Sequence, residues 1–162
     1  MKEEYQHFLN LAESRKKENK KLLQRLKRKK PKELDKIINE LHEQAFEFID
    51  CLECANCCKS ISPSVKDNDI QKIAKALRIK PSVVVSKYMY LDEEQDYVMN
   101  VHPCPFLLPD NYCTIYDARP LACKGYPHTD RNKMHQILNL TLRNSLICPA
   151  VSFIFEELKK QK

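Results

Sequence analysis

Eight cysteines are the feature of this 162-residue chain that most limits how it can fold. Thiolates bind soft and borderline metals strongly, and a C-x2-C step lets two sulfurs from one turn of backbone reach the same ion or cluster. Four of the cysteines stand within eight residues and the other four are spread over the C-terminal half: Cys51, Cys54, Cys57, Cys58, Cys104, Cys113, Cys123 and Cys148. We therefore expect the first group to be half of an eight-cysteine metal site that the later cysteines complete.

The spacing of the cysteines bears on which metal they bind. Zinc sites usually pair two C-x2-C knuckles, whereas the four later cysteines are separated by 9, 10 and 25 positions and supply no second knuckle. C-x2-C-x2-C opens the bacterial ferredoxin pattern, whose remaining ligand is a more distant cysteine followed by proline. Cys104-Pro105 and Cys148-Pro149 both have that form. The pattern thus favours an iron–sulfur cluster, with zinc as the alternative.

The adjacent pair Cys57 and Cys58 departs from the ferredoxin pattern. Neighbouring side chains on an extended backbone point in opposite directions, so the two sulfurs would serve different sites or only one of them would bind. If both bind metal, two sites are expected. If only one binds, a single site with spare thiols is the better interpretation.

Composition excludes several classes of function. The chain has one glycine, Gly125, and no tryptophan, whereas phosphate-binding loops and dinucleotide fingerprints need several glycines at fixed spacing. No carboxylate pair or nucleophile–base arrangement stands out, which favours a protein that is not an enzyme.

Residues 1–10 lack the apolar run of a secretory signal, and no stretch approaches the roughly 18 apolar residues of a membrane span. We expect a cytoplasmic protein whose thiols are ligands, since disulfides would require an exporting route.

Scarce glycine and 31% charged residues favour helices over a turn-rich all-β fold. Apolar periodicity predicts a helix over residues 32–50 that leads into the cysteine cluster, and further helices over residues 65–77 and after Pro149. Pro81 can open another helix through Tyr88, although three consecutive valines leave a strand open.

Two short segments are predicted to be extended. Residues 97–101 form one of them, and residues 106–116 read as strand, turn, strand, which places Cys104 and Cys113 near the ends of a hairpin. A helical turn is expected around Cys123. The expected fold class is mainly α with a small β-hairpin, in a compact domain organised by its metal.

A basic segment precedes this domain. Residues 15–32 contain eleven Lys or Arg and one acid, so this stretch carries +10 while the rest of the chain sums to −4. Residues 13–21 contain no apolar side chain and are not expected to pack against a core. We predict a basic helical arm over residues 1–30 and a cysteine-cluster domain over residues 31–162. Such an arm can recruit a protein partner, a nucleic acid or an anionic membrane surface, although charge runs are usually solvated.

The order of the cysteines and their neighbours resembles a known family. The C-x2-C-x2-C-C motif is followed by Cys-Pro-Phe-Leu at residues 104–107, Cys-Thr-Ile-Tyr at residues 113–116, Arg119-Pro120, Cys123 and Tyr126-Pro127. Over roughly residues 51–155 the chain resembles the YkgJ-type cysteine-cluster family, with Tyr126 where that family commonly has phenylalanine. The resemblance implies a zinc- or iron-chelating domain, often labelled an iron–sulfur protein. Flagellin lysine methylases are similar to the family, so methyl transfer is the last-ranked alternative.

Residues beside the cysteines are candidates to support the metal. Phe106 and Tyr116, with Tyr112 and Tyr126, are placed to cover the sulfurs, and Arg119 to offset the negative charge of a four-thiolate site, as Lys124 also can. The ordinary alternatives are core packing for the aromatic rings and a surface ion pair for the arginine. Among the histidines, only His102 has a spacing, two residues before Cys104, that suggests an extra ligand.

Overall fold

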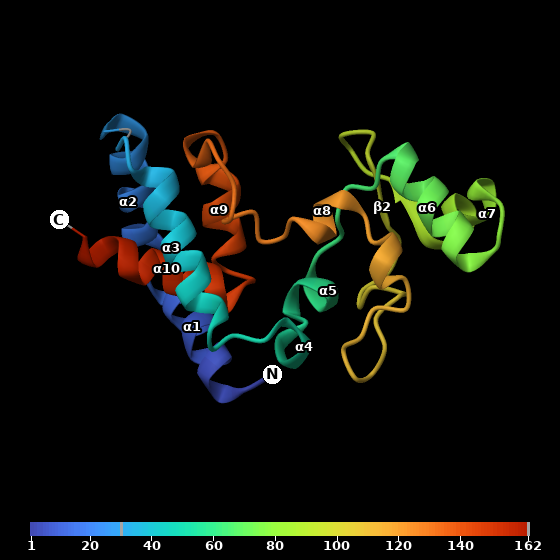
Figure 1. Cartoon of the computed structure of the whole chain (residues 1–162), viewed down its shortest axis with the longest axis horizontal. Coiled ribbons are helices and arrows are strands. Elements are labelled where there is room, and N and C mark those ends of the chain that lie inside the picture. Colours follow the sequence, from blue (N-terminus) through green and yellow to red (C-terminus); the bar gives the residue numbers. More distant parts are fainter. Residues whose placement is uncertain (30, 162) are drawn as a thin grey trace. The chain divides into compact units, whose positions relative to one another are not determined.

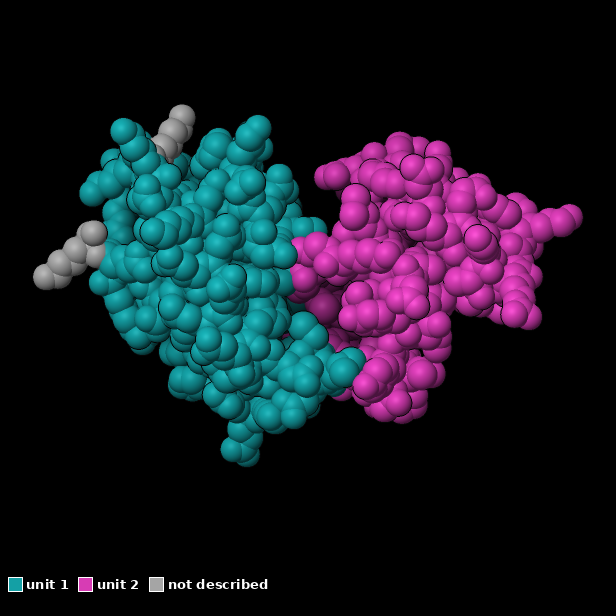
Figure 2. Space-filling model, viewed as in Figure 1, with its two compact units in different colours: residues 1–54, 127–162 teal, residues 55–126 magenta. Residues whose placement is uncertain are grey.

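A computed structural model describes residues 1–29 and 31–161 of the chain. It contains two compact units: Met1–Cys54 with Pro127–Lys162 form unit 1, and Ala55–Tyr126 form unit 2 (Figure 2). The chain leaves unit 1 between Cys54 and Ala55, inside the C-x2-C-x2-C-C motif. The motif is therefore divided, with its first two cysteines in one unit and its last two in the other.

Unit 1 is a set of packed helices (Figure 1). Its C-terminal helix, α10, packs against α1 and α3. The side chains that α10 buries include Val151, Ile154, Phe155 and Leu158. The helices predicted after Pro149 and before the cysteine cluster are thus present, although α3 ends at Phe46, short of the predicted residue 50. The elements of this unit are α1 (Glu3–Ser14), α2 (Lys16–Lys29), α3 (Leu34–Phe46), α4 (Cys51–Cys54), the 3₁₀ helix η2 (Met134–Gln136), α9 (Leu138–Asn144) and α10 (Pro149–Lys160).

The two N-terminal helices are part of unit 1. Tyr5 and Ala12 of α1 are fully buried, α1 packs on α10, and α2 packs on α9. Asn19 is 1% exposed although it lies in the polar stretch that was not expected to pack. Helical geometry explains this, because Asn19 lies seven residues after Ala12 and seven before Leu26 and so faces the same side. Instead of dividing at residue 30, the compact units divide after Cys54 and after Tyr126.

Unit 2 combines short helices with one hairpin. Pro81 stands at the first position of α7, and the valine-rich segment after it is helical. Strands β1 and β2 are antiparallel, with Met89 opposite Met99 and Leu91 opposite Tyr97. A mainly α fold with a small β-hairpin is thereby confirmed. The elements are α5 (Asn56–Ser60), α6 (Asp67–Leu77), α7 (Pro81–Tyr88), β1 (Met89–Leu91), β2 (Tyr97–Met99), the 3₁₀ helix η1 (Tyr116–Ala118) and α8 (Leu121–Lys124).

The hairpin does not lie where the sequence predicted it. Within residues 106–116, Leu107 and Cys113 form an isolated antiparallel bridge, and the N–H of Leu108 donates to the carbonyl of Tyr112 at 2.8 Å. Longer pairing is prevented because Pro105 and Pro109 have no N–H to donate and because η1 begins at Tyr116. The extended segment predicted at residues 97–101 supplies β2 instead.

A hydrophobic cluster in unit 2 places two of the cysteines. Cys104 and Cys113 pack against it, partly buried. Asp69, 4% exposed, accepts hydrogen bonds from the backbone N–H of Lys66 at the start of α6 and of Leu121 at the start of α8. This carboxylate therefore joins the helix that carries Cys123 to the core of the unit. The cluster consists of Val65, Ile70, Ile73, Ala74, Val84, Met89, Met99, Phe106 and Ile115.

Among the described residues, no single helix has the length and apolar composition needed to cross a membrane. Helices α9 and α10 meet those criteria only when taken together, and they are bent by 118°.

Candidate metal centre

Five cysteines belong to unit 2. Cys57 and Cys58 lie on α5, Cys123 lies on α8, and Cys104 and Cys113 lie in the segment between β2 and η1. The backbone N–H of Cys104 donates to the carbonyl oxygen of Cys58 at 2.8 Å, which joins the motif to the later cysteines. The unit thus contains sulfurs from both halves of the cysteine pattern.

Four of these thiols interact electrostatically with one another. Burial raises the pKa of Cys123 to about 12, and negative charge at Cys58, Cys104 and Cys113 raises it further. Burial also raises the pKa of Cys104 and of Cys113, and charge at Cys58 adds to both shifts. A nearby positive charge stabilises thiolates that oppose each other's ionisation, and a bound metal ion supplies one.

Cys58 is the most acidic of the four thiols. A hydrogen bond from its neighbour Cys57 lowers its pKa to about 7 against the opposing effect of burial, and the charges of Arg119 and Lys59 lower it as well. The sulfurs of Cys57 and Cys58 are 3.9 Å apart. The expectation that they point in opposite directions is wrong because α5 is helical there, and successive side chains on a helix differ by about 100°.

Backbone N–H groups point at two of the sulfurs. Hydrogen bonds from Phe106 and Leu107 act on the Cys104 sulfur, and one from Ile115 acts on Cys113. Each lowers the pKa of its thiol, although burial raises the same pKa by more. Hydrogen bonds of this kind delocalise thiolate charge and tune a bound metal or cluster.

Arg119 carries a positive charge that acts on several of these thiols. Its guanidinium lies over the Tyr116 ring at 3.5 Å, and its Nε donates to the Tyr116 carbonyl at 2.9 Å. Its positive charge lowers the pKa of Cys58, Cys113 and Cys123, and burial has the larger, opposite effect on each of them. The ring of Tyr116 therefore orients a cation toward the sulfurs.

The aromatic residues that were predicted to cover the sulfurs differ in their exposure. Tyr112 and Tyr116 are each 53% exposed. Phe106 is 3% exposed and belongs to the hydrophobic cluster. His102 is exposed, and its Nε2 lies 3.2 Å from the Ser62 hydroxyl, so the structure gives it a partner other than a metal.

Three cysteines form a separate group in unit 1. Cys51 and Cys54 stand at the two ends of α4, and Cys148 occupies the position just before the first residue of α10. Burial raises the pKa of Cys148 to about 12; hydrogen bonds from the first turn of α10 lower it, and charges at Cys51 and Cys54 raise it. The sulfur of Cys54 also lies 4.0 Å from the thioether sulfur of Met1.

A tyrosine near the N-terminus holds the segment that carries Cys51 and Cys54. The buried Tyr5 hydroxyl accepts a hydrogen bond from the Asp50 N–H at 3.0 Å and lies 2.8 Å from Glu53 Oε2. Lys2 pairs with the same Glu53 carboxylate. Sequence reasoning missed this contact because it treated residues 1–30 as an arm; the signal was Tyr5 at the start of an amphipathic helix.

The donor set fits a zinc ion or an iron–sulfur cluster, both of which are bound by thiolates. Within residues 1–29 and 31–161, no three or more His, Cys, Asp or Glu side chains stand in a geometry that could hold a metal ion. Binding therefore requires the thiols of one group to turn toward a common point. The staggered χ1 rotamers of a cysteine point its sulfur in three different directions.

Groups of cysteines carried by short helices and loops are typical of cysteine-cluster, metal-chelating domains. The chain belongs to the CxxCxxCC family, which matches residues 50–144 and is described as a "Putative zinc- or iron-chelating domain". The match covers more than half of the 162 residues and includes every cysteine except Cys148. The predicted family and the metal-binding class are thereby confirmed. No curated protein and no solved structure matches the chain significantly.

Proposed function

We propose that the protein binds an iron–sulfur cluster through Cys58, Cys104, Cys113 and Cys123 and acts in redox chemistry, metal handling or support of a partner. The observation that supports this choice is that charge at Cys58 acts on the ionisation of Cys104, Cys113 and Cys123, and charge at Cys104 and Cys113 acts on Cys123 as well. When bound, such a cluster supplies one-electron transfer. The residues of this chain contribute the thiolates, N–H donors to two of the sulfurs, and the positive charge of Arg119.

The other four cysteines are proposed ligands as well. Cys51, Cys54 and Cys148 form the group of unit 1, and Cys57 lies beside Cys58. Two thiolate groups are part of the proposal, because charges at Cys51 and Cys54 act on Cys148 within unit 1, as charge at Cys58 acts on its neighbours within unit 2. A cytoplasmic location is part of the proposal, because thiolate ligands persist in a reducing compartment.

Anaerobic purification followed by metal and sulfide analysis tests this function. We expect a brown protein that contains iron and acid-labile sulfide. A colourless protein with stoichiometric zinc would replace the cluster with the zinc alternative. A folded, monomeric protein that contains neither metal would overturn both.

A zinc-stabilised interaction module is the second candidate. It is favoured by the two N–H donors at the Cys104-Pro105 turn, because hydrogen-bonded cysteine turns also hold structural zinc. Removal of structural zinc should unfold unit 2, since metal binding supplies folding free energy in such domains. A unit that keeps its fold in excess chelator would contradict this second candidate.

A further inference from the structure

The two faces of helix α2 differ in their exposure and in their charge. Its leucines point into unit 1, where Leu22, Leu23 and Leu26 are 5%, 4% and 8% exposed. With about 100° between successive residues, the opposite face is formed by side chains that are all exposed. These are Lys17, Lys20, Lys21, Gln24, Arg25 and Arg28.

The cations of this face lack acidic partners within the described part of the chain. The one acid of α2, Glu18, pairs with Lys159 of α10 at 3.6 Å. No ion pair among the described residues involves Lys21, Arg25 or Arg28. Like charges four residues apart repel along a helix, so this arrangement carries a cost that a bound polyanion would remove.

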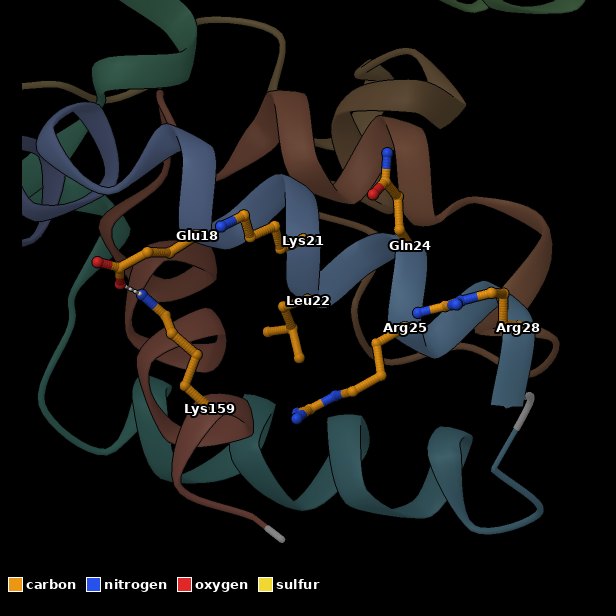
Figure 3. A pocket seen from close by; sticks show the side chains of 7 residues that line it. All are labelled: Glu18, Lys21, Leu22, Gln24, Arg25, Arg28 and Lys159. Atoms are coloured by element: carbon orange, nitrogen blue, oxygen red, sulfur yellow. Dashed lines mark ion pairs between the residues drawn. The ribbon is translucent and has the colours of Figure 1, made fainter.

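A pocket of about 500 Å³ lies along one edge of the face. Figure 3 shows the Glu18–Lys159 pair on one side of it and Arg25 and Arg28 on the other. Lys21 and Leu22 also line it. Four cations and a single, already paired acid thus surround a concave surface, which suits an anionic group such as a phosphate.

Burial of the leucines decides against a membrane as the partner. A helix that lies in a bilayer surface must expose an apolar face, and in α2 that face is covered by unit 1. The exposed face carries no aromatic side chain, so it lacks the stacking platforms typical of single-strand binding. A regular array of phosphates is complementary to an exposed face of this kind.

We propose that the exposed face of α2 binds the phosphate backbone of a double-stranded nucleic acid without reading its bases. At 1.5 Å per residue, Lys17, Lys21 and Arg28 span about 16 Å along the helix. A duplex carries one negative charge for about every 1.7 Å of its axis, so the face meets several phosphates at once. This inference does not depend on which metal the cysteines bind.

Fluorescence anisotropy with a labelled, mixed-sequence RNA duplex of about 20 base pairs tests the proposal, using the full chain with its metal bound. The test variant combines Lys21→Gln, Arg25→Gln and Arg28→Gln. The matched control combines Lys72→Gln, Lys75→Gln and Lys80→Gln, which removes the same charge from exposed positions in unit 2. We expect the test variant to bind at least about tenfold more weakly and to lose about 2 to 3 units of salt slope, while the control stays within about twofold.

Four results would overturn the proposal. Two concern the duplex: no binding by the unaltered protein at low salt, or equal losses of affinity in both triple variants. The other two are tighter binding of a single strand of equal charge, and binding to vesicles containing phosphatidylserine without binding to the duplex. A variant that keeps the charges, Arg25→Lys with Arg28→Lys, should retain binding. Its loss of binding would also contradict recognition by charge. Circular dichroism and metal content, equal in all variants, separate these outcomes from unfolding and from failure of the metal proposal.

Discussion

The backbone N–H of Cys104 donates a 2.8 Å hydrogen bond to the carbonyl oxygen of Cys58. This bond joins the end of the C-x2-C-x2-C-C motif to the Cys-Pro turn within unit 2. Cys104 and Cys113 also pack against the hydrophobic cluster of the unit, so their positions depend on its core. The metal-binding chemistry of the unit is therefore coupled to its folding.

The two cysteine groups should respond differently to substitution. Cys58→Ala removes a thiol that interacts with three others, and we expect it to lower the metal content of unit 2 at least about tenfold, because one of four ligands is lost. Cys51→Ala, in unit 1, should leave that metal in place. Iron, zinc and sulfide per chain measure both. Equal losses in the two variants would favour a single shared centre.

The positive charge of Arg119 should slow the release of the bound metal. Arg119→Gln removes the cation whose charge acts on Cys58, Cys113 and Cys123, and we expect metal transfer to a competing chelator to become about 2- to 10-fold faster. Lys124→Gln is the matched control, because Lys124 donates instead to the carbonyl of Asp117. An unchanged release rate in Arg119→Gln would contradict the proposed role.

Asp69 should position the helix that carries Cys123. Asp69→Ala leaves the N–H groups of Lys66 and Leu121 without their acceptor, and we expect a loss of about 1–3 kcal/mol in the unfolding free energy of unit 2. The metal content should fall with it. Asn68→Ala, an exposed neighbour on α6, is the control. Denaturant titration should separate the two, and similar stabilities would show that the buried carboxylate is dispensable.

Tyr5 should stabilise the segment that carries Cys51 and Cys54. Tyr5→Phe removes a hydroxyl that accepts from the Asp50 N–H and contacts Glu53, and we expect unit 1 to lose about 1–2 kcal/mol of unfolding free energy. Tyr90→Phe, at a tyrosine that is 53% exposed, should change it little. Urea denaturation of both variants provides the measurement. Equal midpoints would mean that the Tyr5 hydroxyl contributes nothing to stability.

His42 should make unit 1 less stable in mild acid. Burial lowers the pKa of His42, with smaller opposing effects from Asp130 and Glu43. The unfolded chain then binds a proton more readily than the folded one, so stability is full well above the ordinary histidine pKa of about 6.5 and falls as the pH drops through it. His42→Gln should flatten this dependence between about pH 7 and 5, whereas His135→Gln, exposed in η2, should not. Thermal unfolding across that range tests the difference.

Sequence periodicity located the longer helices because their apolar residues recur at a constant spacing along one face. α6 and α10 appear close to where the pattern predicted them, and α3 appears with a shorter end. For residues 81–88 the sequence left helix and strand open, and the structure has the helix α7. The hairpin was harder to place. The segment with a recognisable turn forms one isolated bridge, whereas Met89–Leu91, which continues directly from α7, supplies the partner of β2. Strand pairing depends on which segments the core brings together, and local spacing carries little of that information.

The sequence by itself determined the eight thiols, the Cys-Pro turns, the basic stretch before Pro31 and the CxxCxxCC family, because these depend on residue identity and order. Only the tertiary structure decided how the thiols are grouped and how residues 1–29 are used. A unit boundary between Cys54 and Ala55 divides a motif that is continuous in sequence, and buried contacts of Tyr5 and Ala12 include the N-terminal helices in unit 1. Both outcomes arise from contacts between residues far apart in the chain, which local spacing does not encode.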